Sequence, residues 1–313
     1  ALIHARRERF GIDCDWRRGW LAVATSERKA RALQASGEAL ERRHGYPMQW
    51  VERDELPRWV ASPRYVAGSY DPRSGHLHPL KYTLGLARAA ASLGGVLHEH
   101  SPVSAIAHGP QPVVRTARGS LRCRHLLLAG NVYLEGLAPA IRTRVMPAGT
   151  HIIASAPVGP ELAQRLIPCG AAVCDTNHVL DYFRFSADHR LLYGGRVSHA
   201  GASPQALAEQ LAGRMRQTFP ALAAVPVDYA WGGFVDLTMN RAPDFGRLGE
   251  QRNVYYLQGF SGHGLALTGL AGRLVAEAIA GDARRFDVFA RVRHRPFPGG
   301  RWPVSGSPDG ASP

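Results

Sequence analysis

The sequence predicts an α/β (α+β) protein with two domains, and three features lead to that prediction. A short unbroken apolar run within 125–131 is ended by Gly130, which is typical of a parallel strand buried on both faces. A second apolar strand at 254–257 leads through a glycine-rich turn into a long apolar helix. Between them, short strand-like segments separated by polar turns indicate an antiparallel sheet. A length of 313 residues is enough for two such domains with proper cores.

The charge is strongly positive but scattered. Thirty-eight Lys+Arg face 25 Asp+Glu, which gives a formal net charge of +13. Only Lys29 and Lys81 are lysines, so the excess of arginine resembles a coding bias and not a selected phosphate-binding surface. Nucleic-acid binding would require a clustered basic stripe or a known module, and the sequence shows neither. A basic nucleic-acid-binding protein is therefore a distant alternative.

Several other classes of protein are excluded or disfavoured. No stretch has the roughly 18 uncharged apolar residues of a membrane helix, and the first thirty residues lack the apolar core of a signal peptide, so we expect a cytoplasmic protein without a membrane partner. The four cysteines form no CxxC pair and are expected to be reduced thiols. The histidine pairs 76/78 and 98/100 have no third ligand at a spacing typical of metal sites, so no metal site is predicted.

In the first third of the chain, helices alternate with irregular segments. A strand near 20–23 precedes a helix with Ser26 as its N-cap and Gly45 after its last residue, His44. Residues 62–78 are rich in turn formers and are expected to form a loop. A second helix begins at Pro79 and ends before Gly94-Gly95, with its apolar face formed by Leu80, Leu84, Ala87 and Ala91.

Short strands follow, at 96–97, 103–107, 113–116 and 121–123, with a hairpin turn at 117–120 and then the buried strand at 125–131. The antiparallel meander is expected from strand-like segments at 150–156, 171–175, 179–185 and 190–194. After it, Ser203 and Pro204 start a helix whose buried face carries Leu207, Leu211 and Met215.

The most informative segment is the glycine turn Gly259-x-x-Gly262-x-Gly264 between the strand at 254–257 and the helix expected over about 262–280. The helix contains two charges, Arg273 and Glu277, so it is predicted to be buried nearly all round. Its first turn has unpaired N–H groups at the positive end of the dipole, which favours an electron-rich ligand. A tight connection without a ligand explains the glycines equally well. The spacing is neither GxGxxG nor a P-loop.

Two segments near the C-terminus indicate a protein family: GFSGHGLALTGLAGRLVAEAIAG at 259–281 and RFDVFARVRHRPFPGG at 285–300. They resemble the C-terminal end of the FAD-dependent oxidoreductases of the D-amino-acid oxidase superfamily, most closely the gamma-glutamylputrescine oxidoreductase branch. Further blocks fit the same family in the same order, at 70–103, 124–131, 174–196 and 231–246.

The resemblance implies a fold and a set of domains. It implies an FAD/NAD(P)-binding Rossmann-like domain formed by 76–146 and 231–300, a substrate domain with an antiparallel sheet formed by 1–75 and 147–230, and a flexible tail at 301–313. Family members open with a strand–GxGxxG–helix unit that binds the FAD diphosphate. This sequence starts beyond that unit, so the Rossmann-like domain is expected to be incomplete and FAD binding by the chain alone stays open.

The resemblance also implies site residues. Val103 would contact the adenosine end of FAD, Ala129, Gly130 and Asn131 would pass near the diphosphate, and Arg241 and Pro243 would lie near the isoalloxazine. The pyrimidine edge of the flavin would face Gly259, Phe260, Ser261, Gly262, His263 and Gly264. His263 could also border the substrate. Tyr182 and Arg184 alternate onto one face of their strand and are the expected substrate contacts, although a solvated strand face is an equally good interpretation.

The function that the resemblance implies is FAD-dependent oxidation of a C–N bond in an amine or amino acid, such as a gamma-glutamylated polyamine. Hydride would pass to the flavin and O2 would be the acceptor, which would place the enzyme in polyamine catabolism. The alternative is a non-catalytic remnant of the fold that binds no FAD alone. The oligomeric state cannot be predicted.

Overall fold

The computed structural model describes residues 2–198 and 203–298, which form two compact units. The first unit contains the described residues within Ala1–Gly11, Leu86–Ala148 and Phe234–Pro313, and the second contains Ile12–Gly85 and Gly149–Gly233. The division between the two units, predicted after residue 75, lies after Gly85 in the structure. Residues 2–11 belong to the first unit and not, as predicted, to the same unit as the residues that follow them. The roles predicted for the two parts stay predictions. The tail predicted at 301–313 lies outside the described residues.

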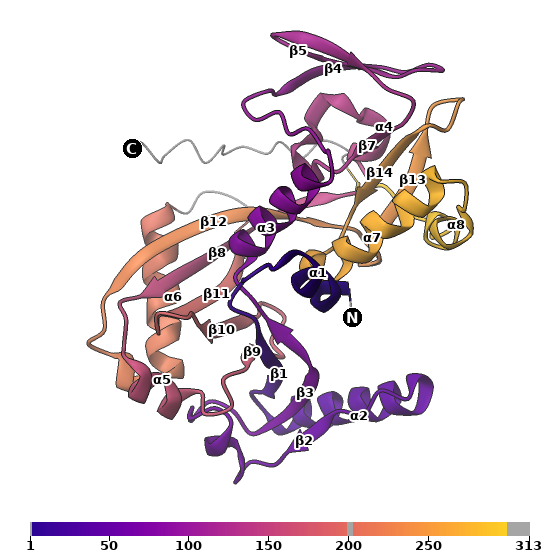
Figure 1. The fold of residues 1–313 in the computed structure, drawn as a ribbon. Coiled ribbons are helices and arrows are strands. Elements are labelled where there is room, and N and C mark those ends of the chain that lie inside the picture. The colour runs from indigo at the N-terminus through magenta and orange to yellow at the C-terminus, as the bar shows by residue number, and fades with distance from the viewer. Residues whose placement is uncertain (1, 199–202, 299–313) are drawn as a thin grey trace. The chain divides into compact units, whose positions relative to one another are not determined.

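An eight-stranded sheet with the order β12-β8-β11-β10-β9-β1-β3-β2 forms the centre of the second unit, and β8 and β12 continue into the first (Figure 1). The meander β8-β11-β10-β9 is antiparallel, as predicted, and β1 runs parallel to β9. The strands are β1 Arg17–Ala24, β2 Gln49–Val51, β3 Ala67–His76, β8 Met146–Ser155, β9 Ala172–Asp175, β10 Asp181–Phe185, β11 Leu191–Ser198 and β12 Val227–Leu237.

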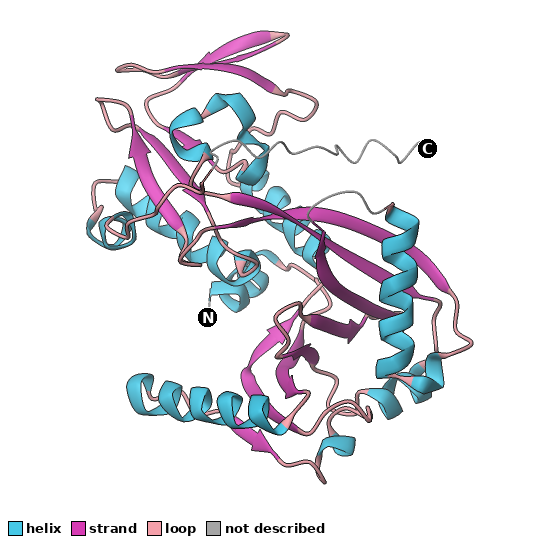
Figure 2. Cartoon of the chain, turned by 180° about the vertical axis from the view of Figure 1, so that it is seen from behind, coloured by secondary structure: helices cyan, strands magenta, loops and turns pink. Residues whose placement is uncertain are grey.

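Aromatic and aliphatic side chains form the core of this unit against one face of the sheet. Phe183 stacks on Tyr193 with ring centroids 5.4 Å apart, and Phe219 meets Phe183 edge to face at 5.2 Å. Helix α6, Pro204–Thr218, packs across the sheet (Figure 2) and buries Leu207, Leu211 and Met215, as predicted. Its N-cap is Ser203, whose Oγ accepts a hydrogen bond from the Ala206 amide at 3.2 Å. A shorter helix, α5 Pro160–Leu166, and two 3₁₀ turns, η1 Leu56–Arg58 and η3 Pro220–Leu222, complete the unit's smaller elements.

Helix α2, Glu27–His44, confirms the predicted helix ends. Ser26 precedes it in an extended conformation, and Gly45 ends it in the left-handed region with φ 58°. The Gly45 amide donates to the carbonyl of Glu41 at 2.8 Å, so one of the last carbonyls of the helix has a partner.

The prediction of a loop at 62–78 is wrong, because Ala67–His76 forms strand β3. Pro72 has no amide to donate, and a proline usually excludes a strand from the interior of a sheet. Here it lies at an irregularity, since the β1 pairing steps from Trp20 opposite Asp71 to Arg18 opposite Gly75. On its other side β3 pairs with β2 only through 68–70, so nothing in the ladder requires an N–H from Pro72.

Helix α3, Pro79–Ser92, forms where predicted but buries a different face. The predicted apolar face is wrong: Leu80 and Leu84 are exposed, whereas Tyr82 and Ala89 are buried. Gly85 decides this orientation, because a Cβ there would lie 2.3 Å from Cγ2 of Ile12. The face with the smallest side chain, and not the one with the leucines, is the one that packs against Ile12.

The first unit has a three-stranded sheet of its own, with the order β13-β14-β7 (Figure 1). Strand β14, Val254–Gln258, is parallel to β7, Leu126–Leu128, and antiparallel to β13, Asp244–Leu248. The predicted buried strands thus share a sheet. Burial of β7 on both faces is wrong, since Leu127 is 39% exposed. The helices around this sheet are α1 Leu2–Phe10, α4 Pro139–Arg142, α7 Gly264–Ile279 and α8 Arg284–Ala290, with the 3₁₀ segment η2 Asn131–Leu137 after β7.

A second small sheet of this unit joins β4, Val103–Ala107, β5, Val113–Thr116, and β6, Gly119–Arg122, in a meander with a tight turn at 117–118. This agrees with the predicted strands and hairpin. The strand predicted at 96–97 is wrong, because those residues are exposed and irregular. Two apolar residues without a partner strand gain nothing from an extended conformation.

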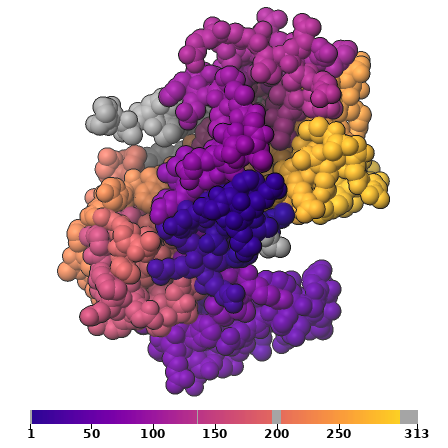
Figure 3. Space-filling model, in the orientation of Figure 1, coloured from indigo at the N-terminus to yellow at the C-terminus, as the bar shows by residue number. Residues whose placement is uncertain are grey.

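Helix α7 begins at Gly264, two residues later than predicted, and the prediction that it is buried nearly all round is wrong. Its buried face consists of Ala271, Leu274, Val275 and Ala278. Leu265 is 44% and Ile279 40% exposed, and the yellow surface in Figure 3 includes this helix. Low charge therefore does not mean burial on every side here. Within the described residues, no helix has the length and hydropathy needed to cross a bilayer.

Candidate functional site

Two turns of the first unit lie at the same edge of its parallel strands. Val254, Tyr255 and Tyr256 pair in register with 126–128, so β7 and β14 run in the same direction side by side, and β14 continues past the end of β7 to Gln258. The segments 129–131 and 259–264, both predicted to contact a cofactor, therefore leave the sheet at its carboxyl edge. Ligands of α/β sheets bind at this edge, which makes it the candidate site.

A buried carboxylate holds the beginning of the glycine turn. Asp236, in β12, is 3% exposed, and its Oδ1 accepts from the Phe260 amide at 3.1 Å. Its Oδ2 accepts from the Gly259 amide, and its backbone carbonyl accepts from the Ser261 amide at 2.9 Å. Burial raises the pKa of Asp236, and the hydrogen bonds from the amides oppose this rise. The amides of 259–261 are thus satisfied within the protein and are not available to a ligand.

The turn that contains Arg241 and Pro243 is joined to the glycine turn through Thr238. The Thr238 amide donates to Ser261 Oγ at 3.3 Å, and its hydroxyl donates to the Ala242 carbonyl at 2.8 Å. Arg241 lies in the left-handed region with φ 62° and is exposed. The structure therefore brings the predicted residues of 241–243 and 259–264 into one cluster.

The outer part of the glycine turn is open. His263 is the N-cap residue of α7 and is exposed, and the helical hydrogen bonds begin with the Leu267 amide, which donates to the His263 carbonyl at 3.2 Å. The amides of Gly264, Leu265 and Ala266 have no acceptor inside the helix. A Cβ at Gly262 would meet no atom within 4 Å. A flat, electron-rich ring can therefore approach this backbone.

The remaining predicted cofactor contacts of the first unit are Gly130 and Asn131, which follow β7, and Val103, which belongs to a separate sheet. Asn131, with φ 54°, begins η2, and its Oδ1 accepts from the Val132 amide at 2.7 Å. Gly130 is required for close packing, since a Cβ would lie 2.8 Å from Cδ2 of Leu134. Val103 is the first residue of β4, opposite Thr116 in the small meander. Strand β4 belongs to a different sheet from β7 and β14, and it contacts η2.

Tyr182 and Arg184 belong to the second unit and share the face of β10 opposite Phe183, as their alternation predicts. The Arg184 guanidinium donates to the carbonyls of Leu77 at 3.1 Å and Phe185 at 3.2 Å. It forms no ion pair with the described residues, and burial lowers its pKa. Burial also raises the pKa of Tyr182. Arg184 is thus a partly buried cation that forms no ion pair in the described chain, and the charge of Asp15 opposes the effect of burial on its pKa.

The ring of Tyr182 packs on Gly194 of the neighbouring strand. A Cβ at Gly194 would lie 2.1 Å from Cε2 of Tyr182, so Gly194→Ala must displace the ring. We expect a loss of about 1–3 kcal/mol in the free energy of unfolding, as for other overpacked sites. Urea unfolding followed by circular dichroism measures this loss. Gly213→Ala, in helix α6 where a Cβ meets nothing within 4 Å, is the control and should not destabilise. Equal stability of the Gly194 variant would contradict the packing.

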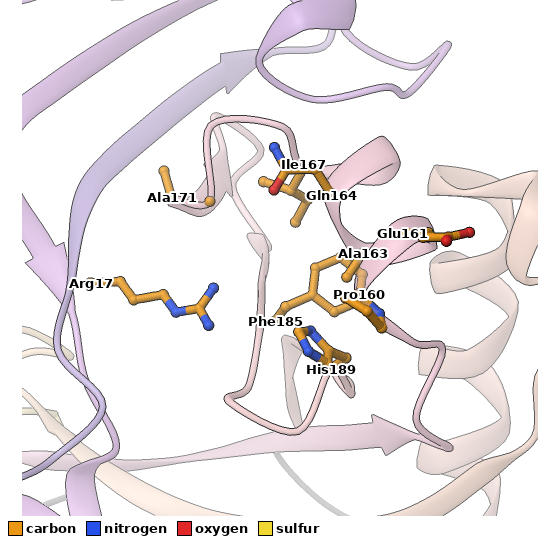
Figure 4. Close-up of a pocket in the computed structure, with 10 residues that line it drawn as sticks. Arg17, Pro160, Glu161, Ala163, Gln164, Ile167, Ala171, Phe185 and His189 are labelled. Carbon is orange, nitrogen blue, oxygen red and sulfur yellow. The ribbon is translucent and has the colours of Figure 1, made fainter.

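A pocket of about 390 Å³ lies elsewhere in the second unit (Figure 4). Arg17 extends into it from β1 toward Phe185 and His189, and residues of α5 line another side. Neither Tyr182 nor Arg184 lines this pocket. Among the described residues no group of three or more His, Cys, Asp or Glu could hold a metal ion, and the histidine pairs 76/78 and 98/100 form no such group.

Sequence reasoning missed Asp236. A single acidic residue inside the apolar run at 234–237 is an unusual feature of a strand, and this signal was available. Its partners, however, lie 23 and 24 residues further along the chain, and only the fold shows the contact.

Comparisons with known proteins identify a family and several relatives of this chain. The family model described as "FAD dependent oxidoreductase" matches residues 1–278. Gamma-glutamylputrescine oxidoreductase of Escherichia coli (strain K12) is 42% identical over 301 residues, which are 96% of this chain and 70% of that protein. The probable oxidoreductase OrdL of Haemophilus influenzae is 39% identical, over 96% of this chain and 70% of the relative.

Solved structures show the same fold. The crystal structure of glycine oxidase from Geobacillus kaustophilus superposes with a TM-score of 0.79 at 24% identity, covering 94% of this chain and 80% of that one. This likeness concerns the fold, whereas the family match and the two relatives identify FAD as the cofactor. The chain is a member of the family of FAD-dependent oxidoreductases.

Proposed function

We propose that this protein uses FAD to oxidise a C–N bond in an amine or amino acid, with a gamma-glutamyl amine as substrate and O2 as electron acceptor. The observation that carries the proposal is the open set of amides at the start of α7, beside the carboxyl ends of β7 and β14. The 42% identity to a protein named for gamma-glutamylputrescine supports this substrate class over glycine or sarcosine.

In this proposal, residues of the first unit hold the FAD molecule. The amides of Gly262, Gly264 and Leu265 would hold the pyrimidine edge of the flavin, with Arg241 and Pro243 near the ring. The segment 129–131 would pass near the diphosphate and Val103 near the adenosine. When bound, FAD supplies the hydride acceptor. The protein's part is to stabilise negative charge at the start of α7 and to hold the substrate in line.

Arg184 is the proposed partner of a substrate carboxylate. It is a cation with no ion pair among the described residues, and a gamma-glutamyl group carries the carboxylate that would complete it. Tyr182, on the same strand face, would flank the substrate. His263, exposed at the N-cap of α7, would border the flavin or the substrate.

The experiment compares substrates with the FAD-loaded protein. The wild type should bind FAD, show flavin absorbance, and release hydrogen peroxide with gamma-glutamylputrescine at a kcat/KM about 100-fold above that with glycine or sarcosine. Arg184→Met should raise KM for gamma-glutamylputrescine by about 10–100-fold, because a charge-assisted contact is lost. Arg165→Met, which removes an exposed arginine of α5 in the same unit, is the matched control and should leave KM unchanged.

Three results would contradict the proposal. A protein that takes up no FAD contradicts the cofactor site and favours the non-catalytic remnant. Equal activity with all amines contradicts the substrate class. Reduction of the flavin without peroxide release contradicts O2 as the acceptor.

A further inference from the structure

The buried carboxylate of Asp236 reaches the glycine turn from a different strand of the first unit. Asp236 lies in β12 and receives the amides of Gly259 and Phe260 on its two carboxylate oxygens. No ion pair involves it among the described residues, so its charge is compensated by backbone amides and not by an arginine. This arrangement is a carboxylate clamp on a backbone turn.

The clamp holds a backbone that is otherwise unfavourable. Gly259 has φ 75° and Ser261 has φ 52°, and a left-handed conformation is costly for a serine. Ser261 Oγ donates to the Gly259 carbonyl at 3.2 Å and accepts from the Thr238 amide at 3.3 Å. The His263 amide donates to the Phe260 carbonyl at 2.9 Å. The inner half of the turn is therefore locked by its own hydrogen bonds.

The outer half of the turn is left free by the same contacts. The amides of 259–261 are occupied, and those of Gly264 and Leu265 have no acceptor within the helix. A site that stabilises charge works best when its donors are fixed before the ligand arrives. The clamp fixes the segment that leads directly into these donors.

We infer that Asp236 is a positioning residue of the oxidoreductase: its carboxylate fixes the turn at 259–261 so that the amides at the start of α7 are preorganised for the flavin. This inference rests on the proposed function. A carboxylate is required because it offers two acceptor oxygens to two amides, whereas the asparagine side chain offers one oxygen and would place an NH2 group against an N–H.

The first measurement needs no cofactor. Hydrogen–deuterium exchange of the amides in 258–266 is compared in the FAD-free wild type, Asp236→Asn and Asp236→Ala. The clamp predicts that exchange at both Gly259 and Phe260 becomes at least about tenfold faster in Asp236→Ala, because both acceptors are lost, and that exchange at one of the two amides does so in Asp236→Asn, because asparagine keeps one acceptor oxygen. Unchanged exchange rates overturn the clamp, whatever the protein does with FAD.

The second measurement uses the FAD-loaded protein. Sulfite adds to oxidised flavin and leaves negative charge on the ring, so its dissociation constant reports how well the site stabilises that charge. In Asp236→Asn we expect the dissociation constants of FAD and of sulfite each to rise about tenfold, because the free amides are less well ordered. Asp175→Asn is the matched control, since Asp175 is a buried carboxylate of the second unit that likewise accepts from backbone amides, those of Asn177 and Asp181. The control variant should be less stable than the wild type, but its dissociation constants for FAD and sulfite should not rise.

Each outcome decides the inference. Unchanged sulfite affinity in the Asp236→Asn variant overturns the positioning role. Tighter sulfite binding also overturns it, because the main effect of Asp236 would then be the repulsion between its negative charge and the anionic flavin adduct. A wild type that binds no FAD refutes the proposed function separately, and the exchange experiment still tests the clamp. If the Asp236 variants do not fold, Ser261→Ala removes the lock from its other side and must weaken sulfite binding in the same direction.

Discussion

Replacing Asp181 with alanine is expected to lower the free energy of unfolding by about 3–5 kcal/mol, the largest stability loss that we expect from a single change in this chain. Asp181 is completely buried at the start of β10. Its carboxylate pairs with Arg64 at 3.1 Å and with Arg214 at 2.8 Å. Alanine at this position leaves two arginines in the second unit without their shared anion.

The neighbours of this carboxylate make the loss greater than for an ordinary ion pair. Arg64 Nη1 also donates to Thr218 Oγ1 at 2.7 Å, and Thr218 Oγ1 is 2.9 Å from the Tyr193 hydroxyl in the aromatic core. The network therefore connects three segments that are distant in sequence, and removing its anion loosens all of them.

Urea unfolding of the purified protein measures the effect. Asp188→Asn is the control, because Asp188 is 61% exposed and pairs with Arg190 at the surface, where an ion pair contributes about 0–1 kcal/mol. A loss below about 1 kcal/mol for Asp181→Ala would show that the network does not hold the unit together.

The elements that were predicted correctly carry their signals locally. Helix α6 has a serine cap, a proline at its first position and a spaced apolar face, and each of these acts within a few residues. The ends of α2 and the turn of the β5–β6 hairpin are of the same kind. Local chemistry therefore fixes where an element begins and ends.

The errors concern partners that are far away in the sequence. Pro72 argued against a strand, but the β1 pairing at that point has an irregularity that requires no amide. Leu80 and Leu84 formed the better apolar face of α3, but Ile12 selected the face with Gly85. Periodicity shows that a helix has a preferred side, and the approaching element decides which side is buried.

In the candidate site, too, the local features were predictable from the sequence and the contacts between distant residues were not. The glycine turn and the strand before it were visible as a pattern, and the family resemblance assigned them to a flavin. The alternation of Tyr182 and Arg184 correctly placed both on one strand face. Asp236 and Thr238 could not be recognised as parts of the turn, because their contacts to 259–261 exist only in the folded chain.

Replacing Gly259 with alanine is expected to destabilise the FAD-free protein by about 2–5 kcal/mol and to abolish tight FAD binding. Two costs combine at this position. Gly259 has φ 75°, a left-handed conformation that costs an alanine about 1–2 kcal/mol. A Cβ would also lie 2.4 Å from Cγ2 of Thr238, and such overlap in a packed region costs about 1–3 kcal/mol. Thermal and urea unfolding without FAD measure the sum, and flavin fluorescence titration measures the loss of binding.

Gly262→Ala and a double variant separate the two costs. Gly262 has φ 87° but open space around its Cβ, so Gly262→Ala should lose only the conformational part, about 1–2 kcal/mol. Thr238→Ser removes the obstructing methyl group and keeps the hydroxyl that donates to Ala242. Added to Gly259→Ala, the Thr238→Ser substitution should restore about 1–3 kcal/mol of the free energy of unfolding. If Gly259→Ala and Gly262→Ala were equally stable, or if Thr238→Ser restored nothing, the close approach of Thr238 to the glycine turn would not be what requires glycine at 259.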